Sequence, residues 1–294
     1  MANAKEIKRR MQSIVSTKQI TSAMKMVSAS KLRRAQSQIG AGRPYREKLR
    51  MVLSQVSSSL SGEASDPLLE VREVAHEAFL VMVSNKGLAG GFNHHTLACA
   101  YDAVLEAQKD GKEVSVIAVG RKAQEFFDKR GITIDHAYLE THDIPDPGDS
   151  EMIAKQIRSD YEAGRYDKVT IVYPAFRSAM SQTPTVIPLL PIAADSLDED
   201  GTEKAASYMV DYIFEPDAQT ILSHLLPMYL TNQIHGCLAE AKTGEHGARM
   251  TAMTAATDNA TDLLTRLEVS YNRARQAAIT NEITEIVAGA DALS

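Results

Sequence analysis

The sequence has only two cysteines and no long apolar run, which argues against a disulfide-rich protein and against a membrane-spanning one. No stretch of about 18 consecutive apolar residues occurs in its 294 residues, so no segment is expected to cross a membrane. No secretory signal opens the chain, which predicts a cytoplasmic location. The two cysteines, Cys99 and Cys237, lie far apart and have no Cys or His neighbour at metal-ligand spacing. Neither a disulfide framework nor a metal site is therefore expected.

The sequence also lacks a recognisable catalytic constellation. It contains no Gly-x-Ser-x-Gly and no His-Glu-x-x-His, and its paired carboxylates lie in polar stretches such as Asp146 to Glu151. The glycine-rich stretch Ser84 to Asn93 occupies the place of a phosphate-binding loop, but it lacks the Gly-Lys-Ser/Thr ending and the three-glycine spacing of nucleotide-binding loops. We expect a tight strand-to-helix turn there, no cofactor, and no catalysis by the chain alone.

Acidic residues are scarce at the N-terminal end. Residues 1 to 50 hold thirteen Lys and Arg against two acids, Glu6 and Glu47, a local charge of +11. Subtracting this from the net charge of −6 leaves −17 for the remaining residues. Such a basic segment favours an acidic partner, which is nucleic acid, anionic lipid or an acidic protein surface. Sites for single-stranded nucleic acid usually add aromatic side chains, and the first aromatic here is Tyr45, so an acidic protein surface is favoured.

Glycine and proline are absent from Ala2 to Ile39, which predicts one uninterrupted helix. Its heptad positions are apolar at both ends and polar in the middle: Ile7, Met11, Ile14, Lys18, Thr21, Lys25, Ser28, Leu32, Ala35 and Ile39. In the middle the apolar residues are instead Ile20, Ala23, Met24 and Val27. The apolar stripe is therefore expected to move around the helix, because the partner contact is locally unwound or because a second surface is faced. The pattern resumes after Gly42 and fades near Gly62.

The other end of the chain mirrors the first. From Ala248 to Ala288 there is again no Gly or Pro, and mostly alanine occupies the heptad steps Met253, Ala256, Ala260, Leu263, Leu267, Ser270, Ala274, Ala277, Asn281, Thr284 and Ala288. Alanine allows close approach, so we expect an antiparallel pair of long helices. Upstream, Ala218 to Lys242 is also predicted to be helical, with interruptions at Pro227, Gly244 and Gly247.

Between the two ends, short apolar runs alternate with helical segments. The predicted strands are Ala78 to Val83, Val114 to Val119, Lys168 to Tyr173, Val186 to Leu190 and Tyr208 to Phe214. The predicted helices are His94 to Lys109, Lys122 to Lys129 and Ser150 to Glu162, and Asp195 to Lys204 is predicted to be a polar loop. This alternation predicts a central Rossmann-like α/β domain with a largely parallel sheet. The expected organisation is an N-terminal helix over 1–58, a linker over 59–75, the α/β domain over 76–215 and a C-terminal helix over 216–294.

Several stretches resemble the gamma subunits of bacterial F-type ATP synthases. Ile20 to Arg33 (ITSAMKMVSASKLR) is similar to the N-terminal helix motif of that family, and Ile279 to Ala292 (ITNEITEIVAGADA) is similar to its C-terminal motif. Ala248 to Ala260 and the glycine-rich stretch Ser84 to Asn93 also resemble family segments. The resemblance therefore covers both ends and the middle of the chain in order. Gly244 and Gly247 depart from it, because relatives more often carry Ser and Ala there, and local softening of the helix is the expected consequence.

The resemblance implies a non-catalytic rotor that couples ion flow through the membrane ring to ATP synthesis or hydrolysis. It implies a shaft inside a ring of three alpha and three beta subunits, an α/β domain that binds epsilon and the ring of c subunits, and an influence on ATPase regulation. No nucleic acid and no direct membrane span are expected, and the location implied is peripheral, on the cytoplasmic face of the cell membrane. The residues expected to contact beta are Lys8, Arg9, Arg10, Met24, Lys25, Arg249, Arg275 and Gln276.

Three other functions stay open at this point. One is a basic coiled-coil adaptor that carries an α/β domain and self-associates through its ends. A second is a nucleic-acid-binding protein, for which binding to random DNA would fall steeply with salt. A third is a nucleotide-dependent enzyme, which requires that the isolated chain bind ATP.

Overall fold

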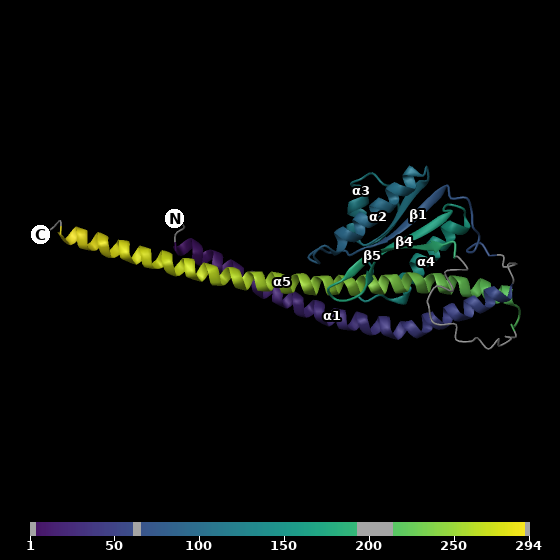
Figure 1. The fold of residues 1–294 in the computed structure, drawn as a ribbon, viewed down its shortest axis with the longest axis horizontal. Coiled ribbons are helices and arrows are strands. Elements are labelled where there is room, and N and C mark those ends of the chain that lie inside the picture. Colours follow the sequence, from purple (N-terminus) through teal and green to yellow (C-terminus); the bar gives the residue numbers. More distant parts are fainter. Residues whose placement is uncertain (1–3, 61–65, 193–213, 292–294) are drawn as a thin grey trace. The chain divides into compact units, whose positions relative to one another are not determined.

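The computed structural model describes residues 4–60, 66–192 and 214–291, and it contains two long helices and a mixed α/β region (Figure 1). Its elements are α1 (Ala4–Ser59), β1 (His76–Met82), α2 (Phe92–Lys109), β2 (Glu113–Val119), α3 (Arg121–Asp128), β3 (Ile134–Tyr138), α4 (Pro147–Glu162), β4 (Lys168–Phe176), β5 (Gln182–Leu190) and α5 (Ala218–Asp291). The predicted loop over 195–204 and the predicted strand over 208–214 lie outside the described residues, apart from Phe214.

The chain divides into two compact units, through both of which the long helices run. The helical unit comprises Met1–Ala29 and Arg249–Ser294, and the α/β unit comprises Ser30–Ala248. The α/β architecture with long terminal helices is confirmed. No helix within the described ranges is both long and apolar enough to span a membrane.

A five-stranded sheet in the order β3-β2-β1-β4-β5 forms the centre of the α/β unit. The pairs β1–β2, β1–β4 and β2–β3 are parallel, and β4–β5 is antiparallel, so the predicted largely parallel sheet is confirmed. The strand β3 was not predicted. Its sequence, Ile-Asp-His-Ala-Tyr, contains the polar residues Asp135 and His136. Its side chains are mostly half-buried, because the strand lies at the edge of the sheet and pairs only with β2 among the described strands.

Each face of this sheet has its own apolar core. On one face α2 and α3 cover Phe79, Val81 and Val116, among other strand residues. On the opposite face α4 and the adjoining parts of α1 and α5 cover Leu80, Ile117 and others. Successive strand residues point to opposite faces, so continuous apolar strands such as β1 and β2 supply both cores.

The interruptions predicted in α5 are wrong, because the helix is continuous from Ala218 to Asp291. Pro227 removes the hydrogen bond to the carbonyl of Ser223, but Ser223 is exposed, so water can hydrate that carbonyl. Leu226 and Leu230, on either side of the proline, are 0% and 1% exposed. Packing therefore holds the helix on both sides of Pro227.

Gly244 and Gly247 are buried within α5, and neighbouring segments pack closely against them. A Cβ atom on Gly244 would lie 3.0 Å from Cγ of Gln182, and one on Gly247 would lie 3.0 Å from Cα of Ala179. Glycine in a helix interior costs about 1 kcal/mol relative to alanine, and here its small size permits this packing.

In the helical unit, the seam of α1 stays on the heptad positions. The polar residues Thr21 and Ser28 are 8% and 3% exposed, whereas Ile20 and Val27 are 59% and 56% exposed. The apolar residues therefore leave the buried seam, as expected, while the seam itself does not move; of the two explanations, local unwinding does not fit and a second surface does. Lys25 is the exception to the heptad, since its side chain is exposed.

On α5 the predicted seam is half right. Met253 and Ala260 are buried and Leu267 and Ala274 are half-buried, as expected. The intervening contacts fall at Thr257, Leu264 and Tyr271, whereas Leu263 and Ser270 are exposed. From Met253 the observed contacts advance by four residues and then by three, in alternation. The prediction assumed a first step of three residues, which misplaced every second position. Ala256 is half-buried beside this seam.

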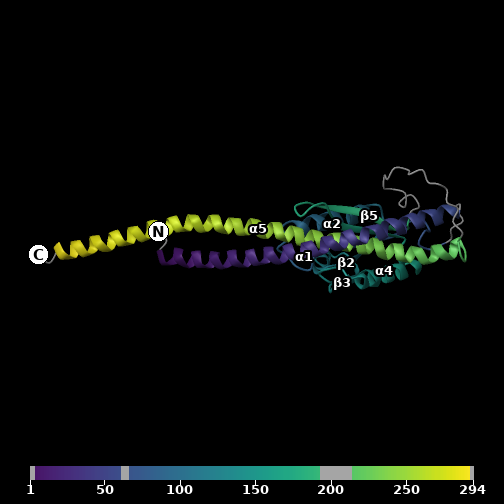
Figure 2. The same ribbon diagram turned by 90° about the horizontal axis from the view of Figure 1, so that it is seen from below.

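The two helices of the helical unit are antiparallel, and α5 continues past the first turn of α1 (Figures 1 and 2). The hydroxyl oxygens of Thr21 and Thr257 lie 2.8 Å apart across the seam. From Arg275 to Ala288 every residue of α5 is exposed, which includes the predicted seam positions Ala277, Asn281, Thr284 and Ala288. Within the described ranges α1 begins at Ala4, and no helix there covers these four positions.

Candidate functional site

All eight residues expected to contact a partner lie in the helical unit. Lys8, Arg9, Arg10 and Lys25 are exposed on α1, and Met24 is half-buried there. On α5, Arg275 and Gln276 are exposed and Arg249 is half-buried. The structure thus leaves most of these side chains available to a partner, at the start of α1 and along α5.

The basic cluster Lys8, Arg9 and Arg10 extends into solvent. Arg10 forms an ion pair with Glu6 one turn earlier, with Nη2 and Oε1 2.9 Å apart. The two side chains are 66% and 53% exposed, so this pair adds little stability and leaves the local charge positive. Such a cluster can bind an acidic surface without a large cost in desolvation.

Exposed apolar side chains form a second surface that the sequence pattern only partly identified. Ile20 and Val27, seven residues apart, share one face of α1, and Met26 beside them is 65% exposed. On the tail of α5, four further apolar residues are between 47% and 71% exposed: Ile279, Ile283, Ile286 and Val287. Their spacing of three and four residues was the available signal. Groups of exposed apolar residues often mark interaction sites, whereas single exposed apolar residues are common on any protein surface.

The glycine-rich turn is braced by its own polar side chains. The backbone N–H of Ser84 donates to Oδ1 of Asn93 at 3.0 Å, and the amide nitrogen of Asn85 donates to the carbonyl of Leu139 at 2.7 Å. Oδ1 of Asn85 also accepts from the backbone N–H of Arg121 at 2.8 Å. These bonds hold the start of the turn against α2 and occupy the backbone N–H groups of Ser84 and Arg121.

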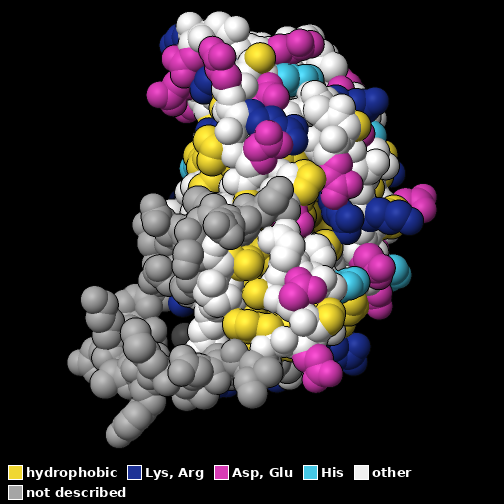
Figure 3. Space-filling model, turned by 90° about the vertical axis from the view of Figure 1, so that its right-hand side faces the viewer, with side chains coloured by type: hydrophobic (Ala, Val, Ile, Leu, Met, Phe, Trp, Pro, Cys, Tyr) yellow, Lys and Arg dark blue, Asp and Glu magenta, His cyan; other side chains and the backbone are white. Residues whose placement is uncertain are grey.

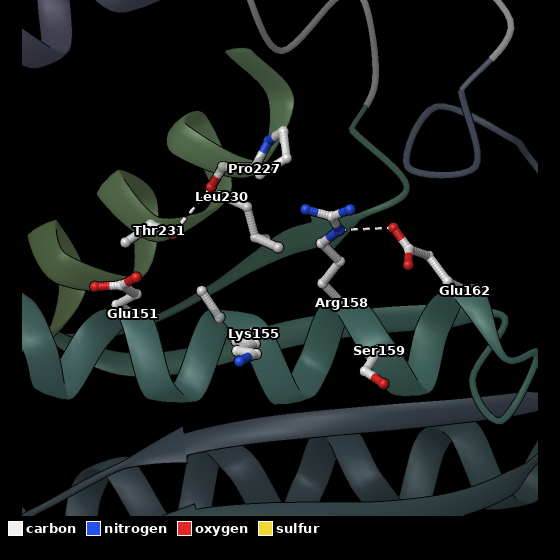
Figure 4. Close-up of a pocket in the computed structure, with 9 residues that line it drawn as sticks. Glu151, Lys155, Arg158, Ser159, Glu162, Pro227, Leu230 and Thr231 are labelled. Carbon is white, nitrogen blue, oxygen red and sulfur yellow. Dashed lines mark hydrogen bonds and ion pairs between the residues drawn. The ribbon is translucent and has the colours of Figure 1, made fainter. Parts of the chain in front are cut away.

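A groove of about 470 Å³ lies between α4 and α5 (Figure 4). Glu151, Lys155, Arg158 and Glu162 line it from α4, and Arg158 is paired with Glu162 at 2.6 Å. From α5, Leu230 points into the groove (Figure 4). Two acids and two bases balance in charge, and the described lining residues include no His or Cys.

Two ionisable groups with shifted pKa values are explained by their structural surroundings. The carboxylate of Asp149 raises the pKa of His142 through a hydrogen bond of 3.0 Å. The same hydrogen bond joins the loop before α4 to that helix. Burial raises the pKa of Cys237 to about 12, so this thiol is unreactive at neutral pH. Within the described ranges, no group of three or more His, Cys, Asp or Glu is arranged to hold a metal ion.

The end of the α/β unit drawn in Figure 3 has a mixed surface. Acidic and basic side chains are interspersed there, with apolar side chains between them, over the part that the described residues form. This mixture differs from the N-terminal turns of α1, where Glu6 is the only acid among several bases. The basic segment of residues 1 to 50 therefore begins in the helical unit and continues along α1 into the α/β unit, which starts at Ser30.

Comparisons with known proteins agree over the whole chain. The family model described as ATP synthase matches residues 3–293. The ATP synthase gamma chains of Desulforamulus reducens and Pelotomaculum thermopropionicum are 44% and 45% identical over 293 residues, with 100% of each chain covered. The chain belongs to the ATP synthase gamma-chain family. The gamma chain of Moorella thermoacetica, at 42% identity over the same length, is another relative within this family.

Solved structures share the fold of this gamma-chain family member. A chain of the Euglena gracilis mitochondrial ATP synthase matches with a TM-score of 0.69 at 18% identity, covering 99% of this chain and 94% of that one. A central-stalk and c-ring structure from Tetrahymena thermophila matches with a TM-score of 0.60 at 22% identity, covering 81% and 99%. At these identities the match concerns the fold.

Proposed function

We propose that this chain is the rotating central shaft of an ATP synthase, which couples ion flow through a membrane ring to ATP synthesis or hydrolysis. Residues 1–58 and 216–294 form the shaft, 59–75 the linker and 76–215 the α/β domain. The observation that carries the proposal is the helical unit, whose two helices pair along a seam and still expose basic and apolar residues on their outer faces.

The proposed partners are three alpha and three beta subunits around one copy of this chain, with epsilon and the ring of c subunits at the α/β domain. Lys8, Arg9, Arg10, Met24, Lys25, Arg249, Arg275 and Gln276 contact beta. The chain has no catalytic site of its own, influences the regulation of ATPase activity, and resides peripherally on the cytoplasmic face of the cell membrane as part of the complex.

Exposed ion pairs suit a part that turns. Each is worth about 0–1 kcal/mol, so contacts between the basic cluster and an acidic surface exchange as the shaft rotates. The exposed apolar residues of the α5 tail add contact area with little directional preference, because the hydrophobic effect is non-directional. A rotor of this kind is guided by its partners without being locked to one of them.

The test is co-expression of this chain with the alpha and beta subunits of its organism, followed by size separation and an assay of Mg-ATP hydrolysis. The expected product is a complex of three alpha, three beta and one copy of this chain that hydrolyses ATP only when the chain is present. A chain that elutes alone, hydrolyses ATP by itself, or binds random DNA with a steep salt dependence contradicts the proposal.

A further inference from the structure

A short stretch of α5 is enclosed on all sides within the α/β unit. Every residue from Gly236 to Gly247 is buried except Glu240, which is half-buried. Three of the enclosed residues carry side chains of the strongly polar types Lys, Glu and His, and Lys242, Glu245 and His246 are only 4%, 5% and 1% exposed. Such groups require specific polar partners, so this stretch makes directional contacts that an apolar helix would not make.

One line of these contacts joins α5 to the β4–β5 hairpin. Glu240, Gly244 and Gly247 are spaced by four and three residues and so lie on one face of the helix. Oε2 of Glu240 accepts a hydrogen bond of 3.1 Å from the backbone N–H of Phe176, at the end of β4. The two glycines allow the hairpin to approach, since Cβ atoms there would lie 3.0 Å from Gln182 and from Ala179.

A second line of contacts joins α5 and α1 to the loop between β3 and α4. Nε2 of His246 lies 3.1 Å from the backbone carbonyl of Asp143, to which it donates. The carboxylate of Asp143 forms an ion pair with Lys31 of α1, which is the main cause that holds the pKa of this carboxyl below its usual range. The start of this loop is also joined to the glycine-rich turn after β1, because the amide nitrogen of Asn85 donates to the carbonyl of Leu139 at 2.7 Å.

The two lines approach α5 from different directions. His246 and Gly247 are consecutive, so their side-chain positions are separated by about 100° around the helix axis. Both residues are within two positions of Ala248, the last residue of the α/β unit, and Lys31 is the second residue of α1 in that unit. The contacts therefore lie at the positions along the chain where the long helices leave the α/β unit.

We propose that these two lines of contacts form a key that stops α5 from turning about its own axis within the α/β unit. Glu240, His246, Asp143 and Lys31 are its positioning residues. A torque applied to the sheet and its covering helices is then transmitted to the long helices without rotation of α5 relative to the sheet. This inference rests on the rotor function proposed above, because only a rotor needs such a restraint.

The test uses the complete complex in proteoliposomes and compares ions pumped with ATP hydrolysed. In the variant Glu240→Ala/His246→Ala we expect hydrolysis to continue while the number of ions pumped per ATP falls by about twofold or more. The matched control is Glu125→Gln on α3, which breaks an ion pair of 2.6 Å with Lys122 whose side chains are 37% and 44% exposed. The control should pump as the wild type does.

A conservative rescue distinguishes lost restraint from general damage. Glutamine in place of Glu240 keeps an acceptor for the N–H of Phe176, and glutamine in place of His246 keeps a donor for the carbonyl of Asp143. The variant Glu240→Gln/His246→Gln should therefore pump more ions per ATP than the double alanine variant does. Pumping that stays as low as in the double alanine variant overturns the proposal.

The remaining outcomes separate this inference from the rotor function. If the double variant does not assemble, Lys31→Met/Asp143→Asn replaces it, since that ion pair is exposed enough for the fold to survive its loss. A fall in ions pumped per ATP then supports the key, and no fall overturns it. If the variant assembles and pumps as many ions per ATP as the wild-type complex, the key is refuted and the rotor function is not. A wild-type chain that never joins alpha and beta refutes the rotor function and the key together.

Discussion

Gly120 follows β2 at a point where the backbone leaves no room for a side chain. Its φ angle is +100°, which L-residues rarely adopt, and a Cβ atom there would lie 2.3 Å from the carbonyl oxygen of Val83. Its N–H also donates to the carbonyl of Tyr138 at 3.0 Å. Close backbone approach and an unusual φ therefore coincide at this one residue, beside the glycine-rich turn.

Replacing Gly120 with alanine should lower the free energy of unfolding by about 2–5 kcal/mol, from backbone strain together with the clash against Val83. The matched control is Gly131→Ala, which also has a positive φ, +67°, but open space around it. The control should cost only about 1–2 kcal/mol, because strain acts there alone. Urea unfolding followed by circular dichroism compares the two variants, and equal losses would contradict the steric explanation.

The hydrophobicity of single residues does not identify which side chains of α1 are buried. Thr21 and Ser28 are buried in the seam while Ile20 and Val27 are exposed. The heptad spacing nevertheless identified the buried positions, because the periodicity of a helix pair determines which residues face the partner. Which surface binds another protein depends on a chain outside this sequence, so exposed apolar residues were not distinguished from a displaced seam.

The elements were predictable where local pattern and burial agree. Apolar runs predicted β1, β2, β4 and the end of β5, and spacing predicted the helices. The structure differs at β3, whose polar residues lie at a sheet edge, and at Pro227, where packing by Leu226 and Leu230 overrides the local preference of proline. The residues of the key were not predicted, because Asp143 and His246 are 103 positions apart.

The strand β5 lies at the edge of the sheet and contains two prolines that protect it. Pro184 is opposite Pro174 of β4, and neither residue has an N–H, so this is a non-hydrogen-bonded pair. The backbone nitrogen of Pro184 therefore faces away from β4. Pro188 is an even number of residues further along the strand, so its backbone nitrogen faces the same way. Two donors are missing from the outer edge, which discourages the addition of another strand.

The double variant Pro184→Thr/Pro188→Thr should restore those two donors and promote edge-to-edge pairing between copies of the chain. We expect a shift from monomer to larger species in sedimentation, with little change in helix content. The control is Pro147→Thr at the start of α4, which removes a proline without opening a sheet edge. A monomeric double variant would show that side chains, and not the missing donors, protect the edge.

For the molecule as a whole, the charge distribution follows the proposed division of labour. Exposed bases precede the first aromatic residue, and the described α/β unit mixes both signs on the surface drawn in Figure 3. The sequence predicted this asymmetry, because charge can be counted along the chain. It also assigned all eight expected contact residues to the shaft helices, but it did not give the bounds of the helical unit, since these require knowing where the long helices leave the α/β unit.

Reversing Lys8, Arg9 and Arg10 together to glutamate tests whether this charge is used in rotation. The side chains are exposed, so unfolding in urea should change by less than about 1 kcal/mol, while ATP-driven ion pumping falls because the cluster then repels an acidic partner. The matched control reverses three exposed bases on and beside α2 and α3, Lys109, Arg121 and Lys129. Salt screens exposed charges, so the gap in pumping between the two variants should narrow as ionic strength rises. Pumping that is equal in both variants at low salt would remove the basic cluster from the mechanism.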